Sequence, residues 1–186
     1  MGRESVYGLQ QKAPRVWRRN GFTLLELLIT LMVLTVLLSS AAPSFVSIIQ
    51  SNEVKRLATE VEWLLAQAKS EAVMRGESMT VEMLGIGRDS ATDTEADWII
   101  QAKTSSSNEI IGKVIGEQFS KVSFYKTFNT NEISFDSMTG RPNYNGSFVF
   151  SVRNNESVEV TTSNMTGRLY VCSERGGYGY GICPSS

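Results

Sequence analysis

The most constraining feature of the sequence is one apolar run, FTLLELLITLMVLTVLLSSAA, which extends from Phe22 to Ala42. Fifteen of its 21 residues are apolar. As an α-helix such a run spans about 32 Å, close to the thickness of a bilayer core. Four basic side chains lie directly before it, within residues 12–19. Because a basic flank stays on the cytoplasmic side, we expect one membrane-spanning helix with the rest of the chain on the outer side.

Charge is unevenly distributed along the 186 residues, although the formal net charge is only −1. Residues 1–21 contain five Lys/Arg and one Asp/Glu, whereas residues 51–186 contain 13 Lys/Arg and 17 Asp/Glu. A basic head before an acidic body is typical of a targeting leader followed by an exported domain. A secretory signal that is cut within residues 39–42 is an alternative, but the apolar region of such signals is usually shorter and lacks a carboxylate.

Glu26, the fifth residue of the run, is the only ionisable side chain within it. An ionisable group in an apolar helix is costly unless it is paired, and the run contains no Lys or Arg. A partner therefore has to come from elsewhere, either from a new α-amino group at Phe22 if the chain is cut there, or from a neighbouring subunit. The second interpretation is a first-turn Glu that stabilises the helix dipole, and both stay open.

The string RRNG, which ends at Gly21, and the following FTLLELL resemble the type III signal of prepilins. The resemblance implies that a prepilin peptidase cuts between Gly21 and Phe22 on the cytoplasmic side and N-methylates Phe22. It also implies that the apolar helix is retained and that it bends or melts near Pro43. The resemblance further implies that Glu26 acts in subunit assembly, by pairing with the amino group of Phe22 on an adjacent subunit.

A second helical pattern follows Pro43. Apolar residues recur at steps of three or four along Leu57–Ala72, with charged residues on the other side, and Gly76 is a natural stop. The sequence therefore predicts one helix over Phe22–Arg75, with Pro43 as the place where an interruption is expected.

From Ser78 onward, short apolar segments alternate with turn-forming groups, as in antiparallel sheets. The predicted fold class is α+β and pilin-like: one long N-terminal helix, transmembrane in its first half, packed on antiparallel β-sheets. We expect a prepilin leader over 1–21, an apolar transmembrane or filament-core helix over 22–50, and a periplasmic α+β domain over 51–186. The expected strands are Met79–Met83, Trp98–Ala102, Ile110–Val114, Val122–Tyr125, Glu132–Phe135, Ser147–Val152, Val158–Thr162 and Arg168–Val171.

A four-residue string, MTGR, occurs twice and ends at Arg141 and at Arg168. We interpret each copy as a turn whose glycine has a positive φ, and the match is too short to indicate a duplication. The blocks ISFDSMTGRP and TGRLYVC resemble the GspH/FimT/FimU branch of the pseudopilins. Together with the N-terminal string, the resemblance extends over nearly all of residues 20–175.

The chain contains no histidine, which excludes Ser-His-Asp and Cys-His catalysis and His-ligated zinc. The acidic stretch 89–97 lacks the glycine turn and bidentate Glu of an EF-hand, so we expect a solvated loop. Cys172 and Cys183 are too far apart for a redox CxxC, and export to an oxidising compartment predicts a disulfide between them; two free thiols in a reducing cytosol are the alternative. We expect no enzyme activity, no metal and no cofactor.

The C-terminal tail interleaves Arg175 with Tyr178, Tyr180 and several glycines. Some members of the branch bind DNA through a C-terminal GRxR string. The corresponding string here is GRLY, so its second arginine is missing. Arg168 and Arg175 are candidate DNA contacts, but the acidic body opposes phosphate binding. We therefore favour a disulfide-closed flexible loop at a protein interface.

These features predict a structural assembly protein: a minor pilin or pseudopilin that helps initiate or cap a type IV pilus in twitching motility, surface attachment or DNA uptake. Its expected partners are prepilin peptidase, other minor and major pilins or pseudopilins, and the bacterial inner membrane, whereas DNA is not favoured. It is expected to cross that membrane once, with a periplasmic C-terminal domain, before it joins the pilus or pseudopilus. The alternatives are a GspH-like pseudopilin of the type II secretion system, a pilus-associated DNA-binding receptor, and a secreted domain released near Ala42.

Overall fold

The computed structural model describes residues 21–87, 97–152 and 156–184, in two compact units that divide between Ala42 and Pro43. The domain bounds expected from the sequence, 1–21, 22–50 and 51–186, stay a prediction. Except for Gly21, the expected leader lies outside the described residues, as does the acidic stretch 89–97 apart from Asp97. Helix α1 (Leu24–Arg75) contributes residues to both units, and every later element belongs to the second.

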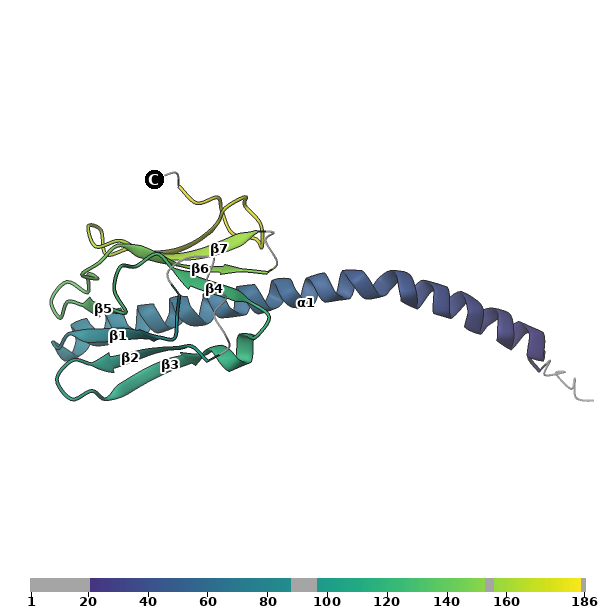
Figure 1. Ribbon diagram of the computed structural model, residues 1–186, viewed down its shortest axis with the longest axis horizontal. Coiled ribbons are helices and arrows are strands. Elements are labelled where there is room, and N and C mark those ends of the chain that lie inside the picture. Colours follow the sequence, from purple (N-terminus) through teal and green to yellow (C-terminus); the bar gives the residue numbers. More distant parts are fainter. Residues whose placement is uncertain (1–20, 88–96, 153–155, 185–186) are drawn as a thin grey trace, which may run out of the picture. The chain divides into compact units, whose positions relative to one another are not determined.

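The described part of the second unit contains eight strands and a short 3-10 helix after α1 (Figure 1). The elements are β1 (Met79–Leu84), β2 (Ile99–Thr104), β3 (Ile110–Ile115), η1 (Gly116–Phe119), β4 (Ser123–Lys126), β5 (Glu132–Phe135), β6 (Gly146–Ser151), β7 (Ser157–Thr162) and β8 (Leu169–Ser173). The strands form two antiparallel sheets of four, in the orders β3-β2-β1-β5 and β4-β6-β7-β8.

The structure confirms the predicted fold class, a long N-terminal helix with antiparallel sheets. Each of the eight expected strands is present, and most bounds differ from the expected ones by a residue or two. Trp98, which was expected to begin a strand, lies just before β2 and is buried. The alternation of apolar and polar residues located the strands because one face of each sheet is buried.

Helix α1 ends where the sequence predicts. Gly76 has a φ of 65°, and the backbone N–H of Glu77 donates to the carbonyl oxygen of Ala72 at 3.2 Å. This bond spans the last turn in the manner of a Schellman motif, in which the residue of positive φ is usually glycine. The interruption expected at Pro43 does not occur, because the backbone is helical through this residue. A proline removes a single hydrogen bond and costs about 3 kcal/mol, and the turns on both sides of it retain their own bonds.

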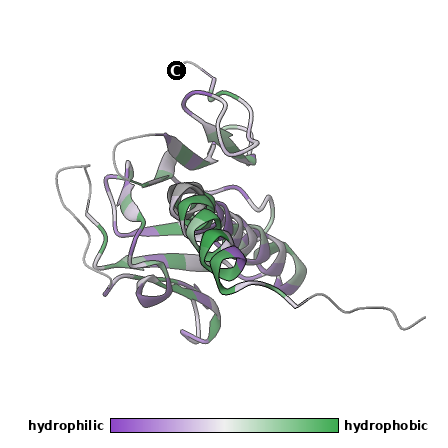
Figure 2. Ribbon diagram, turned by 90° about the vertical axis from the view of Figure 1, so that its right-hand side faces the viewer, coloured by the Kyte–Doolittle hydropathy of each residue, from purple (hydrophilic) through white to green (hydrophobic). Residues whose placement is uncertain are grey.

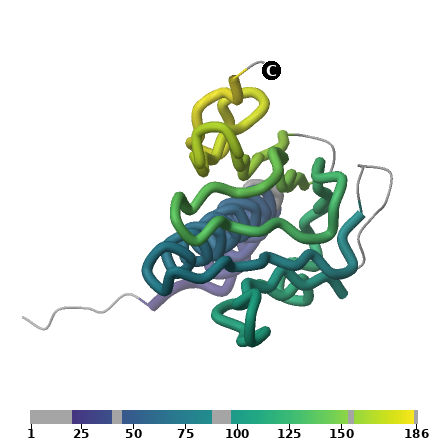
Figure 3. Tube along the Cα trace, turned by 90° about the vertical axis from the view of Figure 1, so that its left-hand side faces the viewer, coloured from purple at the N-terminus to yellow at the C-terminus, as the bar shows by residue number. Residues whose placement is uncertain are grey.

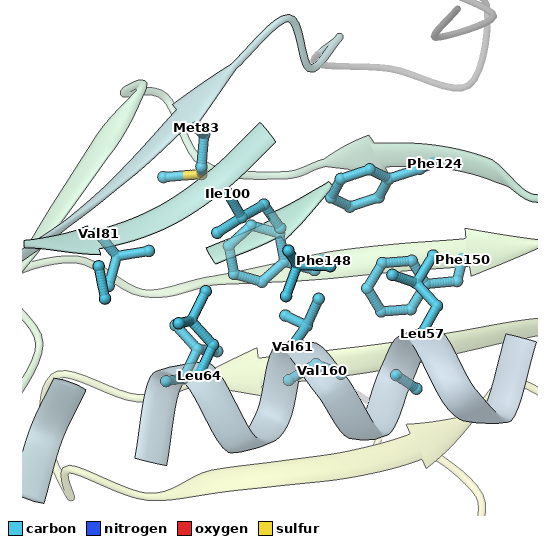
Figure 4. Packing of buried hydrophobic residues seen from close by; sticks show 14 of the residues in the cluster. Leu57, Val61, Leu64, Val81, Met83, Ile100, Phe124, Phe148, Phe150 and Val160 are labelled. Carbon is cyan, nitrogen blue, oxygen red and sulfur yellow. The ribbon is translucent and has the colours of Figure 1, made fainter. Parts of the chain in front are cut away.

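One stripe of α1 forms the centre of the domain core. Leu57, Val61 and Leu64 are buried. Figure 4 shows them facing buried side chains from both sheets, among them Val81 of β1 and Phe150 of β6. The core stripe predicted from the spacing of three and four residues is therefore confirmed.

Aromatic side chains connect the two sheets within this core. The ring centroid of Trp98, which directly precedes β2 of the first sheet, lies 4.6 Å from that of Phe124 in β4 of the second sheet. Phe124 in turn lies 4.9 Å from Phe150. Since large aromatic side chains bury much apolar area, these contacts hold both sheets in one shared core.

Candidate functional site

A capping motif fixes Glu26 in the first turn of α1. The Oγ1 of Thr23, which directly precedes the helix, accepts a hydrogen bond of 3.1 Å from the backbone N–H of Glu26. A Thr followed three residues later by a Glu is the capping-box pattern. The side chain of Glu26 is exposed, and none of the ion pairs among the described residues includes it.

The first part of α1 is apolar on all sides, as the hydropathy colours of Figure 2 show. The large apolar side chains between Phe22 and Leu38 are between 51% and 83% exposed. A helix that is hydrophobic around its whole circumference is normally buried in a protein core or in a membrane. Apolar surroundings would remove the exposed side chains of this segment from water.

Three hydroxyl groups in the described part of this segment are satisfied by the helix itself. Each donates a hydrogen bond of 2.8 Å to the backbone carbonyl oxygen three residues earlier: Thr30 to Leu27, Thr35 to Met32 and Ser39 to Val36. Such bonds remove the need for an outside partner in apolar surroundings.

Among the described residues, no helix combines the length and the hydropathy that a membrane crossing needs.

The expected cleavage position lies at the beginning of the described chain. Gly21 and Phe22 precede α1 and have no regular secondary structure. No heavy atom lies within 4 Å of the place where a Cβ on Gly21 would be, and Phe22 is 80% exposed. Within the described residues, the Gly21–Phe22 peptide bond is therefore open to a peptidase, and its cleavage stays a prediction.

The C-terminal tail is closed by a disulfide. Cys172 and Cys183 are bonded, with their Cα atoms 4.9 Å apart, and the tail forms a loop (yellow in Figure 3). The backbone N–H of Ser173 donates to the carbonyl oxygen of Gly181 at 2.8 Å, and that of Cys183 donates to Ser173 at 3.0 Å. Backbone hydrogen bonds therefore hold the same ends that the disulfide joins.

The tail loop is packed, in contrast to the flexible loop that we expected. Tyr178 and Tyr180 are partly buried against the core, and the hydroxyl of Tyr178 donates to the carbonyl oxygen of Glu156 at 3.4 Å. Burial and the negative charge of Glu156 raise the pKa of the Tyr178 phenol above its usual value. The sequence indicated flexibility through its glycines, but two aromatic rings gain enough apolar contact to order the loop.

The two candidate DNA contacts lie at opposite ends of β8. Arg168 directly precedes the strand and Arg175 follows it, and both are exposed. A strand of five residues is about 17 Å long. The arginines therefore do not combine into one patch with the tail tyrosines, and Arg168 instead shares a shallow groove with Tyr170 and Pro184.

Glu159 of β7 lies beside the disulfide, with a carboxylate oxygen and both sulfur atoms within 4.8 Å of one another. Cysteine binds metals as a thiolate, and both sulfurs are occupied by their mutual bond. In the oxidised protein this group of side chains therefore does not supply a metal site.

The two MTGR strings form turns, as the sequence predicts, with φ values of 63° at Gly140 and 67° at Gly167. Sequence analysis missed that both turns meet on the last part of α1. There the Nζ of Lys69 donates to the carbonyl oxygen of Gly167 at 2.6 Å, and the Lys69 side chain also lies against Gly140. In the sequence, the only feature that links the two turns is the repetition of MTGR.

Comparisons with known proteins address the family directly. Residues 57–167 match the family model described as type II transport protein GspH, and residues 18–42 match the prokaryotic N-terminal methylation motif. A search of curated proteins gave no significant match.

Among solved structures, the chain is similar to two pilin-like proteins. The type IV minor pilin FimU of Pseudomonas aeruginosa is 16% identical with a TM-score of 0.49, over 64% of this chain and 88% of that chain. The minor pseudopilin EpsH from the type 2 secretion system of Vibrio cholerae is 12% identical with a TM-score of 0.49, over 66% of this chain and 98% of that chain. The family assignment rests on the family model, which covers more than half of the sequence. The chain therefore belongs to the GspH family of pilin-like structural subunits.

Proposed function

We propose that this chain is a minor pilin or pseudopilin that helps initiate or cap a type IV pilus. In this proposal a prepilin peptidase removes residues 1–21 and methylates Phe22. Residues 22–50 then hold the protein in the bacterial inner membrane, with the domain 51–186 in the periplasm. Assembly draws the helix out of the lipid and into a bundle of neighbouring pilin helices.

The observation that carries the proposal is the exposed apolar surface of residues 22–38, in a helix that continues into a folded domain. Exposed apolar area of this extent is strongly unfavourable in water, since burial is worth about 25 cal/mol per Å². Lipid and neighbouring helices are two environments that remove it from water. Contacts between unlike surfaces of successive subunits then generate an open helical filament instead of a closed ring.

Glu26 is the residue that we expect to select a partner within this surface. Its carboxylate is fixed in the first turn of α1 and lacks an ion-pair partner among the described residues. A free α-amino group on Phe22 of an adjacent subunit supplies the missing positive charge. Two opposite charges in apolar surroundings attract strongly enough to offset their desolvation only when their geometry is good. The pair therefore favours one register between neighbouring helices.

A role in type II secretion is the second candidate, and it is favoured by the description of the matching family as a type II transport protein. Deletion of the gene separates the two candidates. Loss of surface pili and twitching with normal exoprotein export supports the pilus role, whereas retained exoproteins with normal pili support the secretion role.

A pilus-associated DNA receptor is the remaining alternative. It depends on Arg168 and Arg175, which lie at opposite ends of β8, in a domain whose residues 51–186 carry more acidic than basic side chains. Neither feature favours the binding of a polyanion.

Fractionation of the native host tests the assembly role itself. The full chain, tagged after Ser186, should be found in the inner membrane and in filaments sheared from the cell surface or from overproduced pseudopili. Recovery only as a free protein in the periplasm or the medium would contradict the proposal.

A further inference from the structure

The two MTGR turns are built alike. In each, the backbone N–H of the glycine donates at 2.8 Å to the carbonyl oxygen of the residue four positions earlier: Gly140 to Asp136, and Gly167 to Ser163. In each, the backbone N–H of the arginine donates at 3.3 Å to the threonine Oγ1 of the same turn. Two separate turns, one after β5 and one between β7 and β8, therefore present the same three side chains (Met, Thr and Arg) in the same local geometry.

The turns are fixed against each other and against α1. A Cβ on Gly167 would lie 3.1 Å from the Cγ of Arg141, so the second turn packs directly on the arginine of the first. A Cβ on Gly140 would lie 3.0 Å from the Cγ of Lys69. Together with the hydrogen bond from Lys69 to Gly167, these contacts hold both turns at the end of the domain where α1 terminates (Figure 1). A surface that is ordered before binding loses less entropy when a partner docks.

The cations at this place lack acidic partners. Lys69, Arg141 and Arg168 lie around Gly167, and none of the ion pairs among the described residues includes them. The nearby Asp136 is used within its own turn, where hydrogen bonds from Thr139 hold the pKa of its carboxyl below the usual range. Asp136 is the one acidic residue in the two turn segments 136–141 and 163–168, so these segments and Lys69 together carry three cations and one carboxylate.

Two methionines accompany these cations. Met138 is 86% exposed and Met165 is 79% exposed, each at the first position of its MTGR string. An open groove of about 560 Å³ lies beside the second turn and is lined by Lys69, Val73 and Arg168 among others. Methionine and arginine are enriched in protein–protein interfaces, because methionine adapts its shape and arginine binds carboxylates with two parallel hydrogen bonds.

We propose that the twin-turn surface, which consists of Lys69, Met138, Arg141, Met165 and Arg168, docks an acidic surface on the globular domain of a neighbouring pilin subunit. The cations pair with its carboxylates, and the methionines cover the apolar area between them. The inference rests on the proposed function, because it names the partner of an assembling subunit. A protein partner fits better than a nucleic acid, because a phosphate backbone would leave both methionines without apolar contact.

Photo-crosslinking in the native host tests this docking. Met138 or Met165 of the full chain is replaced by p-benzoylphenylalanine, which is tolerated because both side chains are exposed. Ile182 on the tail, which is 71% exposed, is the matched control position. After irradiation of sheared filaments, mass spectrometry should find the two turn positions joined to a segment rich in Asp and Glu of another pilin, and Ile182 joined elsewhere. Adducts with DNA, with a segment that lacks carboxylates, or at Ile182 alone would overturn the proposal.

Charge reversal provides the second arm. Arg168→Glu, alone and with Arg141→Glu, should lower incorporation into filaments about tenfold or more, because like charges then face each other across the interface. Arg141→Gln with Arg168→Gln should have an intermediate effect. Lys113→Glu reverses an exposed cation on β3, outside the two turns, and should leave incorporation unchanged.

Two controls separate the possible failures. Thermal unfolding of each variant should match that of the parent chain, which excludes misfolding as the cause of a loss. If the parent chain itself never enters filaments, the proposed function is wrong. If the parent and a stably folded Arg141→Glu/Arg168→Glu variant enter equally well, only the docking surface is wrong.

Discussion

Glu26 is the residue on which the proposed assembly mechanism depends most. Glu26→Leu should leave membrane anchoring and cleavage after Gly21 intact, because the segment becomes more apolar and the cut lies outside the first turn. Incorporation into sheared filaments should fall by about a hundredfold or more, since a buried charge pair that loses one partner costs about 3–5 kcal/mol. Quantitative immunoblots of membrane and filament fractions measure both effects.

The matched control is Thr30→Leu, one turn further along α1. Thr30 is also a polar residue in the apolar segment, but its hydroxyl is already satisfied by the carbonyl oxygen of Leu27. Its replacement should leave incorporation close to that of the parent chain. Normal incorporation of Glu26→Leu would mean that the carboxylate is merely a tolerated first-turn residue.

The glycines of the two turns provide a prediction about stability. Gly140→Ala and Gly167→Ala should each lower the free energy of unfolding by about 1–2 kcal/mol, because a side chain disfavours a positive φ. The new Cβ atoms would also lie only 3.0 Å from the Cγ of Lys69 and 3.1 Å from the Cγ of Arg141, respectively, which adds to the strain. Gly181→Ala, where no heavy atom lies within 4 Å of the new Cβ, should change little. Urea unfolding of the unit 43–186 measures the difference, and an equal loss at Gly181 would contradict the argument.

Single residues were predictable where a local rule determines them. The stop at Gly76 and the turns at Gly140 and Gly167 follow from the need for a positive φ. Lys126 was not predictable, because the sequence places a charged residue at a strand end without revealing that it is buried. Its ammonium group donates to the carbonyl oxygen of Thr130 at 2.8 Å, and only the folded chain holds these two groups together.

Among the elements, the C-terminal loop is the one most dependent on a covalent bond. Replacing Cys172 or Cys183 by Ser should lower the free energy of unfolding by about 2.5–3 kcal/mol, the value expected for a loop of this length. Cleavage after Gly21 should be unaffected. Urea unfolding measures this change, and limited proteolysis should cut the tail of the variant earlier than that of the parent, because Tyr178 and Tyr180 then lose their fixed packing against the core.

Reduction of the disulfide is the control for these variants. Dithiothreitol should destabilise the parent protein by a similar amount and should have no effect on a Cys172→Ser/Cys183→Ser variant. Peptide mapping without reductant should find the linked pair in protein taken from the periplasmic face. Two free thiols in that sample would show that the bridge does not form in the cell.

Elements were easier to predict than their arrangement. Apolar periodicity located α1 and the strands, because burial of one face imposes a period on the sequence. The order of strands in the two sheets depends on contacts between distant segments, such as that of Trp98 with Phe124, and leaves no local signal. The sequence did not reveal that α1 continues through Pro43. Proline in a helix costs free energy, but the backbone hydrogen bonds of the neighbouring turns offset this cost and are not considered when the proline is judged alone.

For the whole molecule, the first prediction concerns its mature form. The chain from the native membrane should begin at Phe22 with a methylated amino group and should retain 165 of the 186 residues. The prediction rests on Gly21 before an apolar run that contains Glu26, and on the matching methylation motif over residues 18–42. Intact-mass and N-terminal analysis measure it. A start at or after Ala42 would favour the secreted-domain alternative.

DNA binding also belongs to this scale, because it depends on the summed charge of the domain. We expect little or no binding of the unit 43–186 to DNA at near-physiological salt, since its acidic residues outnumber its basic ones. Fluorescence anisotropy over a salt series measures the affinity, with Arg168→Ala and Arg175→Ala as the test variants. A micromolar affinity that falls steeply with salt and is lost in either variant would reverse this expectation.

The internally bonded hydroxyls of α1 have a consequence for the rate of assembly. When a helix moves from one apolar environment to another, each polar group that must exchange its partner adds to the activation barrier. Thr30, Thr35 and Ser39 keep their partners throughout, because these lie on the same helix. Under the proposed function, the groups whose surroundings must change are then the carboxylate of Glu26 and the amino group of Phe22. This one pair of charges would thus govern how fast a subunit leaves the lipid, as well as where it docks.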